Sequence, residues 1–255
     1  MKHVIFYFTG TGNSLQIARD LSLLIQNAEC RPISKEIKDK REYPIEKCGL
    51  VFPVYFGALP PLVVDFLNTL IIKDINYFYA IATCNDFSGG ALHIIKKILK
   101  NNGKILNAGF SIKMPGNYLP MYAPLSKEKQ QERFDNAKVN INKIANIIKN
   151  HITVKVSGMG KMLTFLQKGN NKKLHLRDER FWVVEGKCNS CGICEKICPV
   201  QNIKLKEGTP TWHHACQQCM ACIQWCPQEA IQVGEKTKNR ARYQNPFVHL
   251  EDLLN

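Results

Sequence analysis

Eight of the chain's eleven cysteines lie in two copies of one spacing between residues 188 and 226. In each copy, three cysteines follow one another at every third position, a fourth comes four residues later, and a proline follows it directly. The members are Cys188, Cys191, Cys194 and Cys198 in the first copy and Cys216, Cys219, Cys222 and Cys226 in the second. The copies align at a constant offset of 28 residues, which also matches the apolar segments 203–205 and 231–233. Each copy is therefore predicted to end in a short strand.

This spacing resembles that of bacterial-type ferredoxins, which hold two 4Fe-4S clusters. Three thiolates on one tight loop can reach three corners of a cubic cluster. In ferredoxins with two clusters, the fourth cysteine of each copy serves the other cluster. The resemblance therefore implies two ligand sets, one of Cys188, Cys191, Cys194 and Cys226, the other of Cys216, Cys219, Cys222 and Cys198.

Two other uses of clustered cysteines fit this pattern less well. Zinc sites usually combine two Cys-x-x-Cys pairs, often with histidine, and need no third step of the same spacing. Disulfide frameworks are typical of short secreted chains, whereas this chain has 255 residues and its apolar start is too short for a secretory signal. We therefore expect an iron-sulfur domain at residues 187–233 and a cytoplasmic location. The oxygen sensitivity of such clusters suggests an anaerobic host.

The amino terminus reads as a strand, a glycine-containing loop and a helix. Residues 4–8 are all apolar and predict a buried strand, and from Ser14 onward apolar residues recur at helical spacing. The loop between them is Thr9-Gly10-Thr11-Gly12-Asn13-Ser14. Its glycines permit close backbone approach, so that amide groups can converge on an anion, and its three hydroxyls add donors. It lacks both the Gly-Lys-Ser/Thr ending of a P-loop and the third glycine of a dinucleotide fingerprint. An ordinary polar turn is the alternative.

This hydroxyl-rich loop resembles the FMN-phosphate loop of flavodoxins, and the elements after it follow the same plan. Further strands are predicted at 29–33, 47–54, 75–83 and 104–112, and helices at 62–70, 90–100 and 128–149. Alternating strands and helices predict an α/β fold for residues 1–150, a flavodoxin-like doubly wound five-stranded parallel sheet. The cysteine region adds a small α+β ferredoxin domain. Residues 151–186 are predicted to bridge the two, and residues 234–255 to form a C-terminal tail.

The loops after the third and fourth predicted strands are candidates for contacts with a flavin ring, because ligands of such sheets bind at the carboxyl ends of the strands. The candidates are Tyr55, Phe56 and Gly57 in the first loop and Cys84, Asn85, Asp86, Phe87, Gly89 and Gly90 in the second. Tyr55 or Phe56 is suited to one ring face and Phe87 to the other, although each is explained equally well as a core or lid residue. By the flavodoxin resemblance, the Gly57 peptide is a candidate to flip when flavin N5 gains a proton.

The three remaining cysteines, Cys30, Cys48 and Cys84, have no partner spacing. We interpret their thiols as small buried hydrophobic groups rather than as redox centres.

The formal net charge of +14 raises the question of a nucleic-acid partner. Two clusters of about −2 each and an FMN phosphate of about −2 would remove much of this charge. Half of the surplus lies within residues 125–186, without a recognisable nucleic-acid-binding motif. We therefore expect a docking surface for acidic redox proteins and no nucleic acid. No apolar run reaches the length of about 18 residues that a transmembrane helix needs.

The order of the two motifs resembles the flavodoxin–ferredoxin fusion proteins of anaerobic bacteria and archaea, and the resemblance covers most of the chain. It implies an electron-transfer protein that passes single electrons between two 4Fe-4S clusters and FMN. No His/Asp/Ser arrangement for acid–base or nucleophilic catalysis accompanies the motifs. The alternative is a ferredoxin-type oxidoreductase that reduces a small substrate at the flavin.

Overall fold

The computed structural model describes the chain except for residues 1, 27, 38–41, 73–74, 157–177 and 255. The chain forms two compact units. Unit 1 comprises Met1–Thr9, Asn13–Pro115 and Lys127–Asn171, and unit 2 comprises Gly10–Gly12, Gly116–Ser126 and Lys172–Asn255. Two short segments from the first half of the chain thus group with the cysteines. Much of the predicted bridge, 151–186, lies outside the described residues, and the domain limits given above stay predictions.

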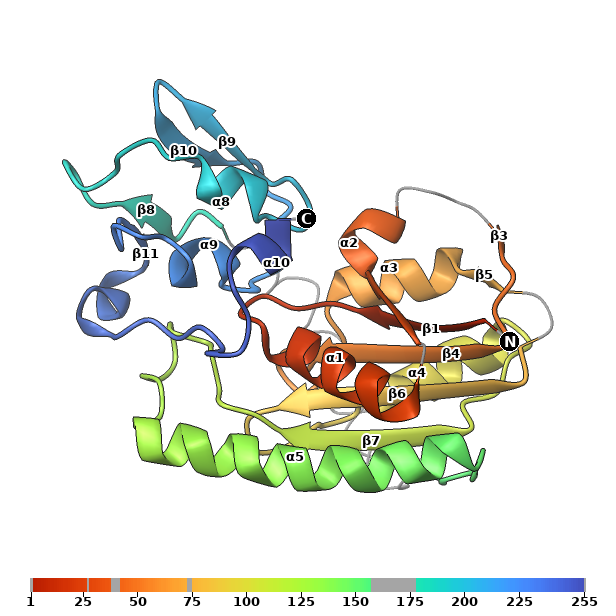
Figure 1. Cartoon of the computed structure of the whole chain (residues 1–255). Helices are drawn as coiled ribbons and strands as arrows, with labels where there is room; N and C mark the ends of the chain where they lie inside the picture. Colours follow the sequence, from red (N-terminus) through yellow and green to blue (C-terminus); the bar gives the residue numbers. More distant parts are fainter. Residues whose placement is uncertain (1, 27, 38–41, 73–74, 157–177, 255) are drawn as a thin grey trace. The chain divides into compact units, whose positions relative to one another are not determined.

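Unit 1 is a five-stranded parallel sheet in the order β2-β1-β4-β6-β7 (Figure 1). Numbered along the chain, these strands follow the order 2-1-3-4-5, which is that of flavodoxin. The predicted flavodoxin-like fold is therefore confirmed. The strands are β1 (His3–Tyr7), β2 (Glu29–Pro32), β4 (Lys47–Pro53), β6 (Tyr77–Cys84) and β7 (Ala108–Lys113). A separate parallel pair is formed by β3 (Glu42–Tyr43) and β5 (Ile71–Ile72).

Helices cover both faces of this sheet (Figure 1). The neighbours α1 and α5 lie on one face, and α3 and α4 lie on the other. The helices are α1 (Asn13–Ile25), α2 (Ile33–Glu36), α3 (Pro61–Thr69), α4 (Ala91–Asn101) and α5 (Lys127–Lys149). Because both faces are covered, the central strands are apolar along most of their length, and all eight residues of β6 are buried.

The fifth strand of the sheet begins later than predicted, at Ala108 instead of residue 104. The reason is Asn107, whose side-chain Oδ1 accepts a hydrogen bond from Phe78 N (2.8 Å). Its backbone N–H donates to the carbonyl of the same residue, Phe78. A side chain thus replaces the backbone carbonyl at the strand's first rung, which a pattern of apolar residues does not reveal.

Unit 2 repeats one backbone pattern at the offset of 28 residues. The short helices α8 (Ile193–Lys196) and α9 (Ala221–Gln224) are related by it, and so are β9 (Ile203–Lys206) and β11 (Ile231–Val233). Each helix is preceded by a residue in the left-handed region, Gly192 with φ 74° and Met220 with φ 62°. The predicted sequence duplication is therefore a duplication of backbone conformation.

Each half of unit 2 completes a two-stranded antiparallel sheet. β9 pairs with β10 (Thr209–Trp212), and β11 pairs with β8 (Phe181–Val183). The tail adds a 3-10 helix, η1 (Glu235–Asn239), and a short helix, α10 (Glu251–Leu254), which buries none of its residues.

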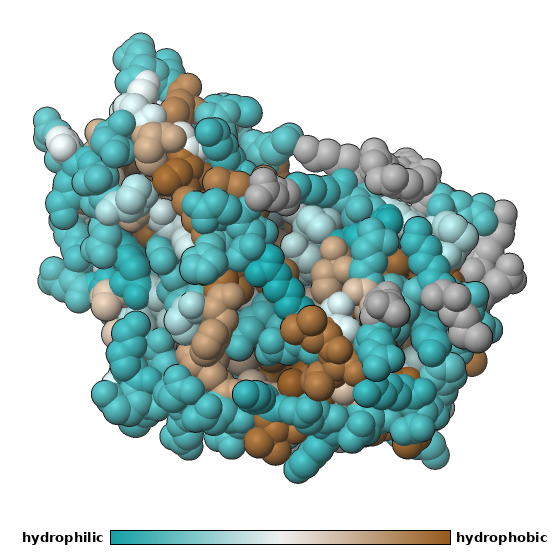
Figure 2. All heavy atoms as spheres, viewed as in Figure 1, coloured by the Kyte–Doolittle hydropathy of each residue, from teal (hydrophilic) through white to brown (hydrophobic). Residues whose placement is uncertain are grey.

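The face shown in Figure 2 is mostly hydrophilic, with a hydrophobic patch over α1. Leu23 of α1 is the most exposed of the large hydrophobic side chains described, at 80%. Among the residues that the structure describes, no helix combines the length and the apolar character that a membrane crossing requires.

Candidate functional site

The eight motif cysteines line two separate cavities of unit 2. One cavity is lined by Cys188, Cys191, Cys194 and Cys226, and the other by Cys198, Cys216, Cys219 and Cys222. Each cavity therefore receives three cysteines from one copy of the motif and the fourth from the other copy. This grouping coincides with the two ligand sets that the ferredoxin resemblance implies.

Backbone amides donate to several of these sulfur atoms. Asn202 N lies 3.2 Å from Cys198 Sγ, and Ala230 N lies 3.3 Å from Cys226 Sγ. These two contacts are related by the 28-residue offset. Cys198 and Cys226, the cysteines that line the cavity of the other copy and are called the crossing cysteines, thus each accept from the backbone amide four residues later. Because an amide donor favours the anionic form of the sulfur, the local backbone is suited to hold thiolates at these positions.

The burial of the cavities disfavours charge on the bare thiols. It raises the pKa of Cys194 to about 11 and that of Cys216 to about 12. The pKa values of Cys219 and Cys222 are also raised, chiefly by burial. Since iron binds thiolates, loading of these sites must release protons. All eleven cysteines lie in the described residues, and no disulfide joins any two of them.

The two cavities have mainly apolar walls. Leu205, Pro210 and Ile231 contribute to the first, and Phe181, Ile203, Trp212 and Met220 contribute to the second. Among the described residues, no three His, Cys, Asp or Glu side chains are gathered closely enough to hold one metal ion. A 4Fe-4S cluster takes one thiolate at each of its four iron atoms. Each cavity is lined by four cysteines, so the donor set fits such a cluster.

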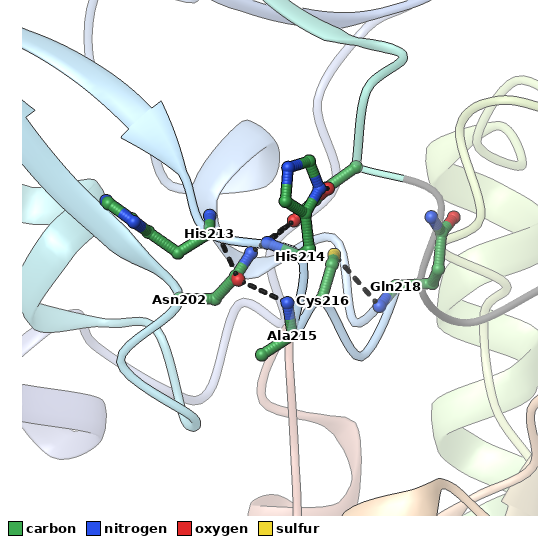
Figure 3. Close-up of polar contacts among 7 residues, drawn as sticks. Asn202, His213, His214, Ala215, Cys216 and Gln218 are labelled. Carbon is green, nitrogen blue, oxygen red and sulfur yellow. Dashed lines mark hydrogen bonds and ion pairs between the residues drawn. The ribbon is translucent and has the colours of Figure 1, made fainter.

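A buried polar pair fixes the segment that leads into the second cysteine loop (Figure 3). Asn202 Oδ1 accepts from the backbone N–H groups of His213 (3.2 Å) and Ala215 (2.6 Å). Asp178, which is 1% exposed, accepts from Asn202 Nδ2 (2.8 Å) and from His214 N (2.8 Å). Sequence reasoning missed this pair because neither residue belongs to a spacing motif. The signal available was weak: Asp178 is a polar residue before the first cysteine motif, and Asn202 is one between the two motifs.

The middle of the predicted phosphate loop, Gly10–Gly12, is packed within unit 2. Trp225 Nε1 donates to Gly10 O (3.1 Å), and a Cβ on Gly10 would lie 2.2 Å from Cys219 O. Asn245 N donates to Thr11 O (2.9 Å). The glycine at position 10 is therefore required by the close approach of a cysteine-loop carbonyl, which is a packing reason independent of any phosphate.

The hydroxyls predicted to face a phosphate also have protein partners. Thr11 Oγ1 accepts from Asn117 Nδ2 (2.9 Å), and Ser14 Oγ lies 2.8 Å from Thr83 Oγ1. Asn13 Nδ2 donates to Pro115 O (2.9 Å). Thr9 is half-buried. The loop thus follows β1 and opens α1 as predicted, which is where phosphate groups bind. Thr11 Oγ1 accepts from Asn117 and therefore keeps its own O–H to donate, whereas either hydroxyl can be the donor in the bond between Ser14 and Thr83.

The two predicted ring loops lie side by side in unit 1. Gly90 N donates to Gly57 O (2.8 Å). Gly89 has a φ of +56°, and a Cβ there would lie 2.1 Å from the same carbonyl. In the first loop Tyr55 is buried and pairs with Ala58, and Phe56 has a φ of 50°. Phe87 of the second loop is 55% exposed. The glycines are therefore needed for the contact between the loops.

An arginine that the sequence analysis missed anchors the second ring loop. Arg133 of α5 forms an ion pair with Asp86 (2.6 Å) and donates to the carbonyl of Asn85. Arg133 lies on a helix some fifty residues after the loop, and no local spacing links it to that loop. The neighbouring thiol of Cys84 is buried, and burial raises its pKa to about 11.

Comparisons with known proteins agree with the separate parts of the chain. A family model described as "4Fe-4S dicluster domain" matches residues 187–231. None of the curated proteins compared matches the chain.

Similar solved structures include the flavodoxin of Streptococcus pneumoniae TIGR4, at 13% identity and a TM-score of 0.35, with 56% of this chain and 99% of that chain covered. An archaeal flavodoxin covers 57% and 99% at 14% identity and a TM-score of 0.35. An azoreductase from Bacillus anthracis covers 57% and 99% at 13% identity and a TM-score of 0.40. The sheet order itself carries the fold assignment. The chain thus combines a flavodoxin-like fold with a 4Fe-4S dicluster domain, as a flavodoxin–ferredoxin fusion does.

Proposed function

We propose that this chain is an electron-transfer protein that holds two 4Fe-4S clusters and FMN and passes single electrons between them. The observation that carries the proposal is the grouping of cysteines around two cavities, three from one motif copy and one from the other. Cysteines gathered in fours around a cavity have no packing role that hydrophobic residues would not fill better, whereas iron-sulfur clusters require them.

We propose Cys188, Cys191, Cys194 and Cys226 as ligands of one cluster and Cys198, Cys216, Cys219 and Cys222 as ligands of the other. When bound, such clusters exchange one electron each, and a flavin exchanges one or two. The amides of Asn202 and Ala230 favour thiolate at the two crossing ligands. The apolar walls limit the access of water, which affects the potential of a cluster.

We propose FMN as the flavin, with its phosphate at Thr9–Ser14 and its ring at the loops of Tyr55–Gly57 and Cys84–Gly90. The support is the sheet order, the position of these loops after β1, β4 and β6, and the contact between Gly57 and Gly90. In this proposal the loops orient the ring, and a flip of the Gly57 peptide would break the hydrogen bond from Gly90 N to Gly57 O.

Anaerobic purification followed by iron, sulfide and flavin analysis tests the proposal. We expect about eight iron and eight sulfide per chain, as two 4Fe-4S clusters require, and about one FMN released on denaturation. Clusters without any flavin, even after incubation with FMN, would contradict the flavin half of the proposal. Zinc in place of iron would contradict the other half.

The proposal also covers the partner: the basic surplus of the chain favours an acidic redox protein. We expect electron transfer to an acidic ferredoxin or flavodoxin to slow steeply as salt rises from 50 to 500 mM. A screen of the reduced protein against small electron acceptors checks the alternative activity. Saturable reduction of one small molecule would replace the carrier by an oxidoreductase.

A further inference from the structure

The chain has three tryptophans, all in unit 2, and their indole N–H groups differ in whether they have a hydrogen-bond acceptor. Trp182 Nε1 donates to Gly234 O (3.4 Å), and Trp225 Nε1 donates to Gly10 O (3.1 Å). Trp212 Nε1 is buried as well, yet it has no hydrogen-bond partner among the described residues. An indole nitrogen is a donor only, and leaving a buried donor unpaired costs about 1–3 kcal/mol. An acceptor is therefore missing at Trp212.

The place of Trp212 indicates what that acceptor is. Trp212 lines the cavity that contains Cys198, Cys216, Cys219 and Cys222. Its ring is held by Phe181, with centroids 5.4 Å apart and an interplanar angle of 30°. Its backbone pairs with Ile203 of β9, and the next residue, His213, donates to Asn202. The indole is thus fixed at the wall of a cavity whose other polar groups are mainly sulfur atoms.

The equivalent position in the first copy of the motif carries no such donor. At the 28-residue offset, Trp212 corresponds to Val184, which is apolar. No tryptophan lines the cavity of Cys188, Cys191, Cys194 and Cys226. The duplicated backbone therefore carries one feature that is not duplicated.

We propose that Trp212 Nε1 donates a hydrogen bond to a sulfur of the cluster bound in the second cavity and thereby makes the two clusters unequal in reduction potential. A donor to sulfur stabilises the reduced state more than the oxidised state, because the reduced cluster carries one more negative charge. Trp212 raises the potential of its own cluster and directs the electron to it. This inference rests on the proposed function, since it requires bound clusters.

The test is Trp212→Phe, which keeps an aromatic ring against Phe181 and removes the donor together with part of the ring volume; the Trp182→Phe control loses the same atoms. Potentials are measured by redox titration with electron paramagnetic resonance. We expect one cluster to become harder to reduce by up to about tenfold, which is about 59 mV for a one-electron couple, and the other cluster to stay unchanged. Trp182→Phe is the matched control, because that indole already has Gly234 O as acceptor, and it should change neither potential.

Iron and sulfide analysis separates the two possible failures. Wild-type protein without clusters contradicts the proposed function, whereas a fully loaded Trp212→Phe protein with both potentials unchanged contradicts only this inference.

If Trp212→Phe does not load, protein labelled with 15N in its indole rings decides the question. We expect 15N hyperfine coupling to a reduced cluster, retained in the Trp182→Phe/Trp225→Phe double variant, in which Trp212 is the one labelled indole left. The absence of coupling overturns the inference.

Discussion

The cysteine motifs and the glycine loop of this chain differ in how many purposes their residues can serve. The eight motif cysteines line two cavities. The glycine loop, in contrast, is engaged by the protein itself: Gly10 is packed against Cys219, and Thr11 and Ser14 have side-chain partners. Four cysteines gathered around one cavity serve almost nothing but a metal site, whereas glycines and hydroxyls also serve tight packing and local hydrogen bonds. The cysteine motifs therefore support a cluster-binding function more firmly than the glycine loop supports a phosphate-binding function.

The largest expected effect comes from Cys226→Ala, which tests the crossed grouping. We expect loss of the cluster in the first cavity, with about four iron atoms remaining. A marked fall in the stability of unit 2 should follow, since binding of a structural metal adds about 10 kcal/mol to folding in zinc peptides. The surviving paramagnetic signal should equal that of Cys188→Ala.

The outcome that contradicts the crossed grouping is equally specific. If Cys226 serves the copy in which it lies, Cys226→Ala would leave the same signal as Cys216→Ala. Cys30→Ala is the control, because Cys30 lies in β2 of unit 1 and its Sγ donates to Ala18 O; that variant should keep the full iron content.

The next effect is that of Gly10→Ala, which asks whether the glycine loop serves packing. The added Cβ would lie 2.2 Å from Cys219 O, and overpacking of this kind costs about 3 kcal/mol. Urea unfolding followed through the cluster absorbance should move to a lower midpoint. Gly103→Ala is the comparison, because its Cβ would meet nothing within 4 Å; it should cost only about 1 kcal/mol for its left-handed backbone. A Gly10→Ala protein with unchanged cluster unfolding and weakened FMN binding would assign the glycine to phosphate alone.

The fold of unit 1 was predictable because its strands are long and apolar and its loops are short. The predicted strand at 47–54 became Lys47–Pro53, and the predicted helix at 128–149 became Lys127–Lys149. The start of β7 was not predictable, because the side chain of Asn107 replaces a backbone partner. Hydrophobic periodicity indicates which residues are buried, and it does not show where a side chain takes the place of a backbone hydrogen-bond partner.

The site was predictable where its chemistry is local in sequence. The cysteine spacing indicated the two groups around the cavities, but nothing local indicated Asp178, Asn202 or Arg133. These residues act through contacts across 11 to 48 positions of the chain. The grouping of Gly10–Gly12 with unit 2 could not be predicted from the sequence either. A tight packing contact and a phosphate contact both require glycine, so the residue type does not distinguish them.

A smaller effect is expected from Ser14→Ala, which separates the phosphate role from the contact with Thr83. A hydrogen bond to a charged group contributes about 1.5–3 kcal/mol, so we expect FMN binding to weaken about tenfold to a hundredfold. Riboflavin, which lacks the phosphate, should bind unchanged. Fluorescence titration of the flavin-free protein measures both affinities.

The control for this variant comes from the same helix. Ser22 Oγ donates to Ala28 O, so Ser22→Ala also removes one hydroxyl contact of α1 and should cost about 1 kcal/mol of stability without changing either affinity. If Ser14→Ala weakens the binding of FMN and of riboflavin equally, Ser14 serves only its contact with Thr83, and the proposed role of the loop in phosphate binding is contradicted.

The smallest effect is expected from Arg133→Gln, which tests whether the second ring loop is set by a distant helix. Asp86 is 63% exposed, and ion pairs of this kind contribute about 0.2–1 kcal/mol. Because the loop is proposed to contact the ring and not the phosphate, FMN and riboflavin should weaken together, by about twofold to fivefold. Arg31→Gln is the control, since Arg31 pairs with Glu29 of β2 and Glu36 of α2. Weakening of FMN binding alone would place Arg133 at the phosphate instead.

A double-mutant cycle of Asp86→Asn and Arg133→Gln then measures the coupling between the two side chains. Additive effects would show that Arg133 orders the loop through the Asn85 carbonyl rather than through the ion pair.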